Sequence, residues 1–372
     1  MEQVSYESTA RKLRMTTAEM RRIWDVAARS DDSVTMRPTL AARLAAKRVV
    51  PMPYSRAQLF ERMLQCQPSL FTNFPLRQGG VHGGRPSTEH LLEELRAGFP
   101  RAKRARVRTR ETIEYLPIPK VLDRWMRDKA VFGVTDLHYI GTRFDAHVDT
   151  RNLNDFNILP RGTDGFQSQD SFVISTTGAV TDSHSDDHSG SNHCFTGTKL
   201  WLLWDTVEGI EHGLEDAEHC DVYRRAAFDL PTFAGLRSSR WIFIGPGQTM
   251  FIPANLTHKV ITLQPYLGLG SFHAGLPGFV DLLMRWQQLR PIWAAKPTAD
   301  HPCSVAFITR RAIRRMRTLR QADRGERQRW GMPYLKLRLQ SPDLDPAFLE
   351  RQPATRDNAD LRAFVHAARQ SV

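Results

Sequence analysis

The stretch TDSHSDDHSGSNHCFTGTKLWLLWD, residues 181–205, joins a crowd of possible metal ligands to a run of apolar residues. Its first fourteen residues hold three histidines, three aspartates and a cysteine. The run LWLLW that follows, residues 200–204, is typical of a buried β-strand. This combination predicts a metal site carried by strands.

Two residues of the stretch, His184 and Asp186, form an H-x-D pair. On a strand, residues i and i+2 point to the same face, so these two side chains would point together, away from Ser185 and Asp187. Two imidazoles and one carboxylate on one face of an octahedron form a common iron(II) ligand set. We therefore interpret His184 and Asp186 as two of three metal ligands.

The third ligand is expected from GQTMFIPANLTH, residues 247–258. Gly247 suits a turn, and Pro253 would end the buried strand that precedes it. His258 then opens the next apolar run, HKVITL. A strand, a proline bend and a histidine on the return strand form a more specific pattern than one histidine, so His258 completes the predicted set.

Short apolar runs with the character of strands are spread over residues 131–285. They are SFVIST (171–176), LWLLW (200–204), RWIFIG (240–245), TMFIP (249–253), HKVITL (258–263) and LGLGSF (267–272). Turn-forming residues punctuate most of them, which favours a mainly β core built as a barrel or sandwich. Residues 205–240 are expected to be an acidic, partly helical insert.

The flanking regions are predicted to be helical. In residues 1–130, capping signals precede apolar periodicity at Thr16, at Ser55 and at Ser87. Residues 286–372 are basic and include an amphipathic helical pattern. We expect an N-terminal mostly helical region (1–130), a β-barrel (131–285) and a C-terminal basic helical region (286–372).

Three motifs together resemble the JmjC domain. They are TDSHSD (181–186), GTKLWLLW (197–204) and GQTMFIPANLTH (247–258). Thr181 stands three residues before His184, and Lys199 stands fifteen residues after it. The likeness covers residues 171–280 and matches the helical flanks only loosely.

The resemblance implies a double-stranded β-helix of the cupin superfamily, a jelly roll that binds Fe(II) and 2-oxoglutarate and uses O2. It implies that iron is held by His184, Asp186 and His258, and that the far carboxylate of 2-oxoglutarate is bound by Thr181 and Lys199. Asn192 matches a position that often contacts the cosubstrate, and Ser271 or His273 falls near another. The physical logic agrees, because a buried dianion needs a fixed cation and a hydroxyl donor. A surface strand lysine is the alternative for Lys199.

The implied reaction is hydroxylation of a C–H bond, or demethylation where that carbon is attached to nitrogen. A basic peptide such as a histone tail would suit an acidic rim formed by Glu208, Glu211, Glu215, Asp216, Glu218 and Asp221. A solvated acidic helix explains the same residues. A nucleic-acid- or small-molecule-modifying oxygenase of the same fold, or a non-catalytic cupin-like binding module, are the other functions that the sequence allows.

Two competing metal sites are weaker. His188, His193 and Cys194 have residue types that suit zinc together with His219 and Cys220, but their spacing fits no common zinc template. A second H-x-D at His147 lacks both a downstream lysine and a partner histidine after a bend.

Charge and composition restrict the setting. The 372 residues carry a formal charge of +12, with arginine-rich runs at 101–110 and 310–329 that suit either nucleic acid or a solvated surface. The four cysteines form no CxxC pair, and neither a secretory signal nor a long apolar span is visible. These features predict a soluble intracellular protein that uses no membrane, with nucleus, cytoplasm and oligomeric state undecided.

Overall fold

The computed structural model describes residues 43–74, 77–78, 87–109, 112–142, 145, 148–149, 155–163, 167–186, 188–214, 229–254, 256–294, 301–353 and 355–372. The helix expected after Thr16 lies outside these residues. Among the helices within them, none has the length and hydropathy needed to cross a lipid bilayer.

One sheet of eleven strands forms the centre of the molecule. Its path runs through β1 (Met52–Pro53), β2 (Ser69–Thr72), β12 (Gln248–Ile252), β10 (Ser189–Asp205), β13 (Leu256–His273), β8 (Ser171–Ser175), β6 (Gly133–His138), β4 (Arg104–Arg108) and β5 (Ile113–Pro117). Off this path, β11 (Arg240–Ile244) pairs with β10 and β9 (Val180–Ser185) pairs with β13. A separate pair joins β3 (Arg77–Gln78) to β7 (Val148–Asp149). The predicted mainly β core is confirmed.

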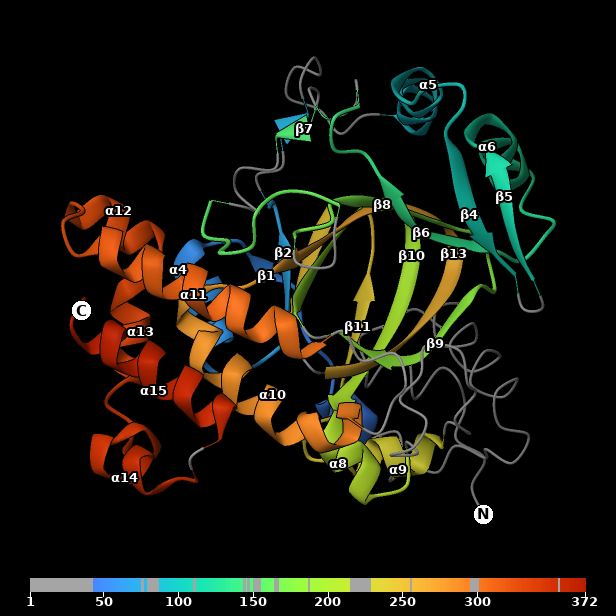
Figure 1. Ribbon diagram of the computed structural model, residues 1–372. Helices are drawn as coiled ribbons and strands as arrows, with labels where there is room; N and C mark the ends of the chain where they lie inside the picture. The colour runs from blue at the N-terminus through green and yellow to red at the C-terminus, as the bar shows by residue number, and fades with distance from the viewer. Residues whose placement is uncertain are drawn as a thin grey trace.

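The sheet has two arms, and its two longest strands, β10 and β13, run through both of them (Figure 1). They pair with each other, antiparallel, from Ser189 opposite His273 to Asp205 opposite Leu256. The N-terminal half of β10 also pairs with β12, and the C-terminal half of β13 pairs with β8; these strands belong to the first arm. The other halves of β10 and β13 pair with β11 and β9 and form the second arm.

The bend between the arms lies at Gly197. The β10–β13 register shifts three times between Cys194 and Lys199. Gly197 has φ +82°, and a Cβ at this position would lie 2.0 Å from the carbonyl oxygen of Pro265. Only glycine combines this left-handed backbone with so close an approach.

Replacing Gly197 with alanine is expected to destabilise the protein by about 3 kcal/mol or more, because backbone strain is added to a clash with the backbone of Pro265 and Tyr266. Gly213→Ala is the matched control: Gly213 has φ +71° but open space around its Cβ position. It should cost only about 1 kcal/mol. Urea unfolding of both variants measures the difference, and equal costs would mean that the close approach at Gly197 is unimportant.

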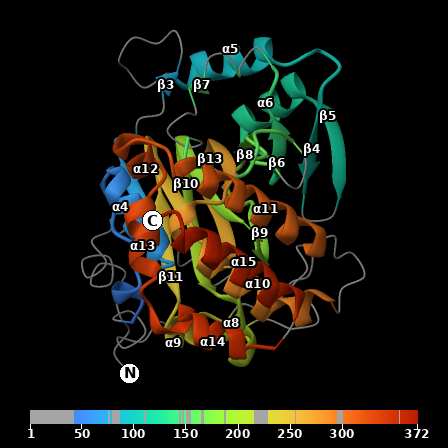
Figure 2. The ribbon, with the colours of Figure 1, turned by 60° about the vertical axis from the view of Figure 1, so that its left-hand side comes forward.

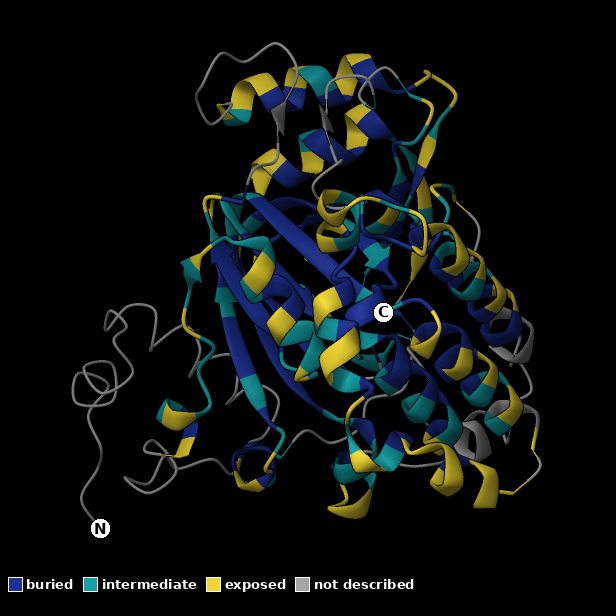
Figure 3. Cartoon of the chain, turned by 90° about the vertical axis from the view of Figure 1, so that its left-hand side faces the viewer, coloured by how far each residue is buried: buried dark blue, intermediate teal, exposed yellow. Residues whose placement is uncertain are grey.

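The space between the arms is filled by apolar side chains. They come from both arms and comprise Leu70, Val173, Cys194, Trp201, Leu203, Ile242, Ile244, Met250, Ile252, Val260 and Tyr266. The alternate residues of β10, Leu200, Leu202 and Trp204, pack instead with Leu230 and Phe233 around α9 (Leu230–Gly235). The strands in the middle of Figure 3 are accordingly buried, while the surrounding helices expose their outer faces. This alternation means that odd-numbered positions of β10 from 199 to 203 face the other arm.

The described ends of the acidic insert are helical, as predicted: α8 (Thr206–Glu211) and α9 flank residues 215–228, which lie outside the described residues. Figures 1 and 2 place α8 and α9 at one end of the sheet and α5 (Thr88–Gly98) with α6 (Ile118–Arg127) at the other.

The C-terminal region is helical, also as predicted. It contains α10 (Phe279–Ala294), α11 (His301–Leu319), α12 (Arg324–Arg329), α13 (Met332–Arg338), α14 (Pro346–Arg351) and α15 (Arg356–Arg369), with short 3-10 helices η2 (Leu276–Gly278) and η3 (Pro342–Leu344). These helices share one apolar cluster with the end of β13, so the region packs on the sheet rather than standing apart.

The N-terminal region is less helical than its sequence predicts. Ser55 and Ser87 do cap α4 (Arg56–Leu64) and α5 through their side chains. However, the same region supplies β2, which pairs with β12, and β4 with β5, which extend the other end of the sheet. The sequence analysis missed these strands because each is only four or five residues long, and in β4 the two apolar residues alternate with arginines.

Candidate metal centre

Three side chains that the sequence singles out converge at one end of the second arm. His184, Asp186 and His258 each place a possible ligand atom within 4.8 Å of those of the other two. The His184 and His258 rings lie 4.1 Å apart, and Nε2 of His258 lies 3.8 Å from Oδ2 of Asp186. His258 is buried, and the other two are half-buried. This group could hold a metal ion.

Strand pairing builds the group. His184 on β9 stands directly opposite His258 on β13, and paired side chains point to the same face of a sheet. Asp186 follows the last residue of β9 and lies two residues beyond His184. Pro253 comes directly after β12, so the chain leaves one strand and returns as β13, which carries His258.

The state of His258 suits metal binding. Nδ1 lies 3.2 Å from the carbonyl oxygen of Leu256, so this nitrogen carries the proton and donates it, which leaves the lone pair on Nε2 towards Asp186. Burial and the neighbouring His184 lower the pKa of His258 well below its usual value, against a smaller opposing contribution from the Leu256 carbonyl. His258 is therefore neutral at pH 7 and does not form an ion pair with Asp186. A histidine whose second ring nitrogen is held by a backbone carbonyl is the usual arrangement of a metal ligand.

Lys199 lies on the same face, deeper between the arms. It is 4% exposed, its Nζ lies 4.5 Å from the centre of the Tyr266 ring, and no carboxylate of the described residues forms an ion pair with it. Burial lowers the pKa of Lys199 to about 7, with a partial opposing contribution from Cys194. A buried ammonium without an anion is costly unless a ligand supplies the charge. The surface lysine alternative is therefore wrong.

Three rows of paired residues connect Lys199 to the metal ligands. His258 stands opposite His184, Val260 stands opposite both Thr181 and Trp201, and Thr262 stands opposite Lys199. His258, Val260 and Thr262 are alternate residues of β13, so their side chains face the same side of the sheet. The strand rises roughly 13 Å over the four residues from His258 to Thr262. Thr181 is half-buried in the middle row, where the Trp201 ring packs 5.2 Å from that of His258.

Asn192 is connected to the site by Tyr266, a residue that no sequence motif includes. Tyr266 donates its hydroxyl to Oδ1 of Asn192, and burial raises the pKa of Tyr266 well above its usual value, so the phenol keeps its proton. The same ring contacts Lys199. Tyr266 lies outside every motif, and its only sequence signal is its place in an apolar strand.

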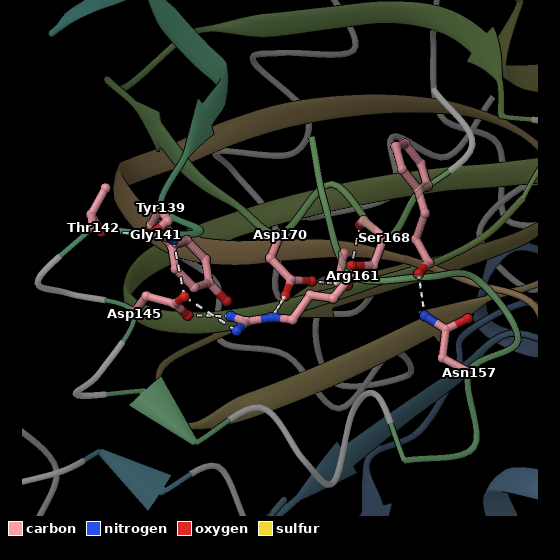
Figure 4. A network of polar contacts seen from close by, with 10 residues as sticks. Tyr139, Gly141, Thr142, Asp145, Asn157, Arg161, Ser168 and Asp170 are labelled. Carbon is pink, nitrogen blue, oxygen red and sulfur yellow. Dashed lines mark hydrogen bonds and ion pairs between the residues drawn. The ribbon is translucent and has the colours of Figure 1, made fainter. Parts of the chain in front are cut away.

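Ser271 and His273 do not join the site. Ser271 stands opposite Ser191, the neighbour of Asn192, and neighbouring strand residues point to opposite faces. Its hydroxyl donates to Asp170, which also accepts from Nε of Arg161 at 2.9 Å, in the polar network of Figure 4. His273 contacts Ser191, 2.7 Å away, and stacks on Phe156. Both expected cosubstrate contacts are thus engaged elsewhere.

The other possible ligands of the opening stretch are dispersed. His193 contacts the Thr249 hydroxyl at 2.7 Å, and His188 is buried between Phe272 and Trp286. Asp187, His147, His219 and Cys220 lie outside the described residues. Within the described part of the chain, the one group that meets the geometry for a metal ion is His184, Asp186 and His258.

The charged segments have mixed roles. Glu208, one of the acidic residues expected at the rim, accepts hydrogen bonds from the Ser238 hydroxyl and from the backbone N–H groups of Ser238 and Arg237. Burial opposes these bonds, but together they hold the pKa of Glu208 below its usual value. Glu211 is exposed, and the other four acidic residues lie outside the described residues. In the basic runs, Arg106 and Arg108 lie within 3.7 Å of Asp136, whereas Arg310, Arg314 and Arg317 are exposed along α11.

Two comparisons with known proteins found no match to this chain. No protein-family model matches the chain, and no curated protein matches it either. The site is therefore interpreted from its own geometry.

Proposed function

We propose that the protein is an Fe(II)- and 2-oxoglutarate-dependent oxygenase with a double-stranded β-helix core, similar to JmjC domains. The observation that carries the proposal is the buried Lys199, which has no carboxylate partner among the described residues and shares one sheet face with the three possible metal ligands. A metal site alone needs no buried cation, but a metal site that also binds a dicarboxylate does.

The residues fit this pair of groups. His184, Asp186 and His258 would hold Fe(II) and leave positions for other ligands. Lys199 would bind the far carboxylate of 2-oxoglutarate, with the Thr181 hydroxyl in the row between. When bound, iron and 2-oxoglutarate supply the oxidation of a C–H bond by O2, with release of succinate and CO2.

The protein's own groups position and shield this chemistry. His258 stays neutral and fixed by the Leu256 carbonyl, so its lone pair is aimed at the metal position. Trp201 packs against the His258 ring, and Tyr266 holds Asn192 beside the lysine. The apolar cluster around them keeps water away from Lys199. Hydroxylation or N-demethylation of a protein, including a histone lysine, is the reaction that we propose first.

The test is cosubstrate turnover. The parent protein, loaded anaerobically with Fe(II) and 2-oxoglutarate and then exposed to air, should release succinate. Lys199→Met should weaken 2-oxoglutarate binding by roughly 10- to 100-fold, since it removes a charged hydrogen bond, while metal affinity stays unchanged. The matched control is Lys120→Met, because Lys120 is exposed.

Two outcomes would contradict the proposal. If the metal-loaded parent binds 2-oxoglutarate no better than Lys199→Met does, the lysine serves another anion. If metal binding occurs without any succinate release, the non-catalytic cupin-like module becomes the better interpretation.

A further inference from the structure

A second candidate site lies outside the metal centre. A small pocket, partly open to solvent, lies where the ends of β2 and β12 meet α4 and α10. Leu59 and Met63 of α4, Phe251 of β12 and Leu282 of α10 give it apolar walls. None of the metal-ligand candidates and neither Lys199 nor Thr181 lines it.

One polar atom of the cavity is unpartnered. Ser69 on β2 is 1% exposed, and its hydroxyl has no hydrogen-bond partner among the described residues. A buried hydroxyl without a partner costs about 1–3 kcal/mol, so a ligand group that bonds to it is favoured.

The lining is cationic. Arg62 and Arg285 both line the cavity, and no aspartate or glutamate does. Arg285 is neutralised by Asp205 at 2.7 Å. Among the described residues, the side chain of Arg62 bonds to the amide oxygen of Gln67 and forms no ion pair. Burial, together with Asp281, raises the pKa of the Cys66 thiol to about 11, so this lining residue brings no negative charge at neutral pH.

We propose that this cavity binds a small organic carboxylate, whose carbon chain lies against the apolar walls and whose carboxylate meets Arg62 and Ser69. The site is separate from the proposed cosubstrate site and does not depend on it. Its lining nevertheless includes Ser189, three residues after Asp186, and Ala254, four residues before His258. The pocket therefore borders both segments that carry metal ligands.

Calorimetric titration of the 372-residue, metal-free protein with hexanoate, hexan-1-ol and hexylammonium tests the proposal. Hexanoate should bind at least about tenfold more tightly than the alcohol, because it adds a charge-assisted hydrogen bond, and hexylammonium should bind most weakly. Arg62→Met should remove the preference for hexanoate, Arg62→Lys should keep part of it, and Ser69→Ala should weaken binding severalfold. Arg310→Met, with the same change of charge on the exposed face of α11, should bind like the parent.

Lys199→Met separates this cavity from the metal centre. It should bind hexanoate like the parent; binding that is lost in Lys199→Met but kept in Arg62→Met would place the carboxylate at the cosubstrate site and overturn the proposal. Equal affinity for hexanoate and hexan-1-ol, or no hexanoate binding at millimolar concentrations, would overturn it as well. Circular dichroism of each variant establishes that the fold is retained.

Discussion

Replacing His258 with alanine is expected to weaken Fe(II) or Co(II) binding by more than about 100-fold, because the variant lacks one of three ligands and loss of a mere supporting contact already costs 10- to 100-fold. His258 is neutral, buried and held through Nδ1, so the lone pair on Nε2 is already oriented for a metal ion, and the variant loses this ligand atom. Succinate release should fall with metal affinity. Titration with Co(II), followed by its visible absorption, measures the binding.

The control for this experiment is His212→Ala. His212 is an exposed histidine that ends α8, so its removal changes the histidine count but not the site. His184→Ala supplies a second test at a half-buried position, where a folding defect is less of a concern. Parent-like metal affinity in both His184→Ala and His258→Ala would show that the ligand assignment is wrong.

Replacing Lys199 with methionine is expected to stabilise the protein in the absence of cosubstrate. The pKa of Lys199 is about 7 in the folded protein, against 10.5 for an unperturbed lysine such as that of the unfolded chain, so the unfolded state binds the extra proton between these values. The loss of folding stability caused by burying the charged Lys199 is therefore complete below pH 7, and it disappears as the pH rises towards 10.5. Since one pKa unit is about 1.4 kcal/mol, it reaches at most about 5 kcal/mol, less about 1–2 kcal/mol for the lost contact with the Tyr266 ring.

Urea unfolding of the parent and Lys199→Met at pH 6, 8 and 10 measures this effect. The variant should be more stable by about 3 kcal/mol at pH 6, and the difference should shrink at pH 10. Lys120→Met should show no such pH dependence, because that lysine is exposed. A destabilised Lys199→Met at pH 6 would mean that the ammonium has a partner in the fold, and Lys199 would then give no support to a cosubstrate anion.

Together these two variants separate stability from function. Removal of a side chain that serves the fold should reduce stability, whereas removal of a side chain that serves a ligand can increase stability. His258→Ala tests the metal, and Lys199→Met tests the anion, so a failure of one does not decide the other.

Much of the site could be predicted because its signals are local. His184 and Asp186 lie two residues apart at the end of one strand, and the apolar runs that became β8, β10, β11, β12 and β13 could be recognised from short windows of residues. Helix capping by Ser55 and Ser87 is equally local, since the serine and the amide that it accepts from lie three residues apart. Such features depend on neighbours in the chain, and these are visible in any sequence.

Other features could not be predicted, for the opposite reason. Ser271 has the right residue type and a nearby position, but the β10–β13 register places it opposite Ser191 and turns it to the wrong face. A shift of one residue reverses every side chain on a strand, and register is decided by pairing rather than by the strand's own sequence. Tyr266 was missed because its partners Asn192 and Lys199 lie on another strand.

The sequence by itself determined which residue types were available: the histidines, the carboxylate, the lysine and the strands that carry them. Only the tertiary structure decided that His258 stands opposite His184 and that Lys199 is buried without a carboxylate partner among the described residues. The physical reason is that antiparallel pairing of β13 with β9 and β10 joins residues 51 to 84 positions apart, through backbone hydrogen bonds and the burial of apolar side chains. Those interactions leave no local pattern in the chain, yet they place the cation and the three possible metal ligands on one face.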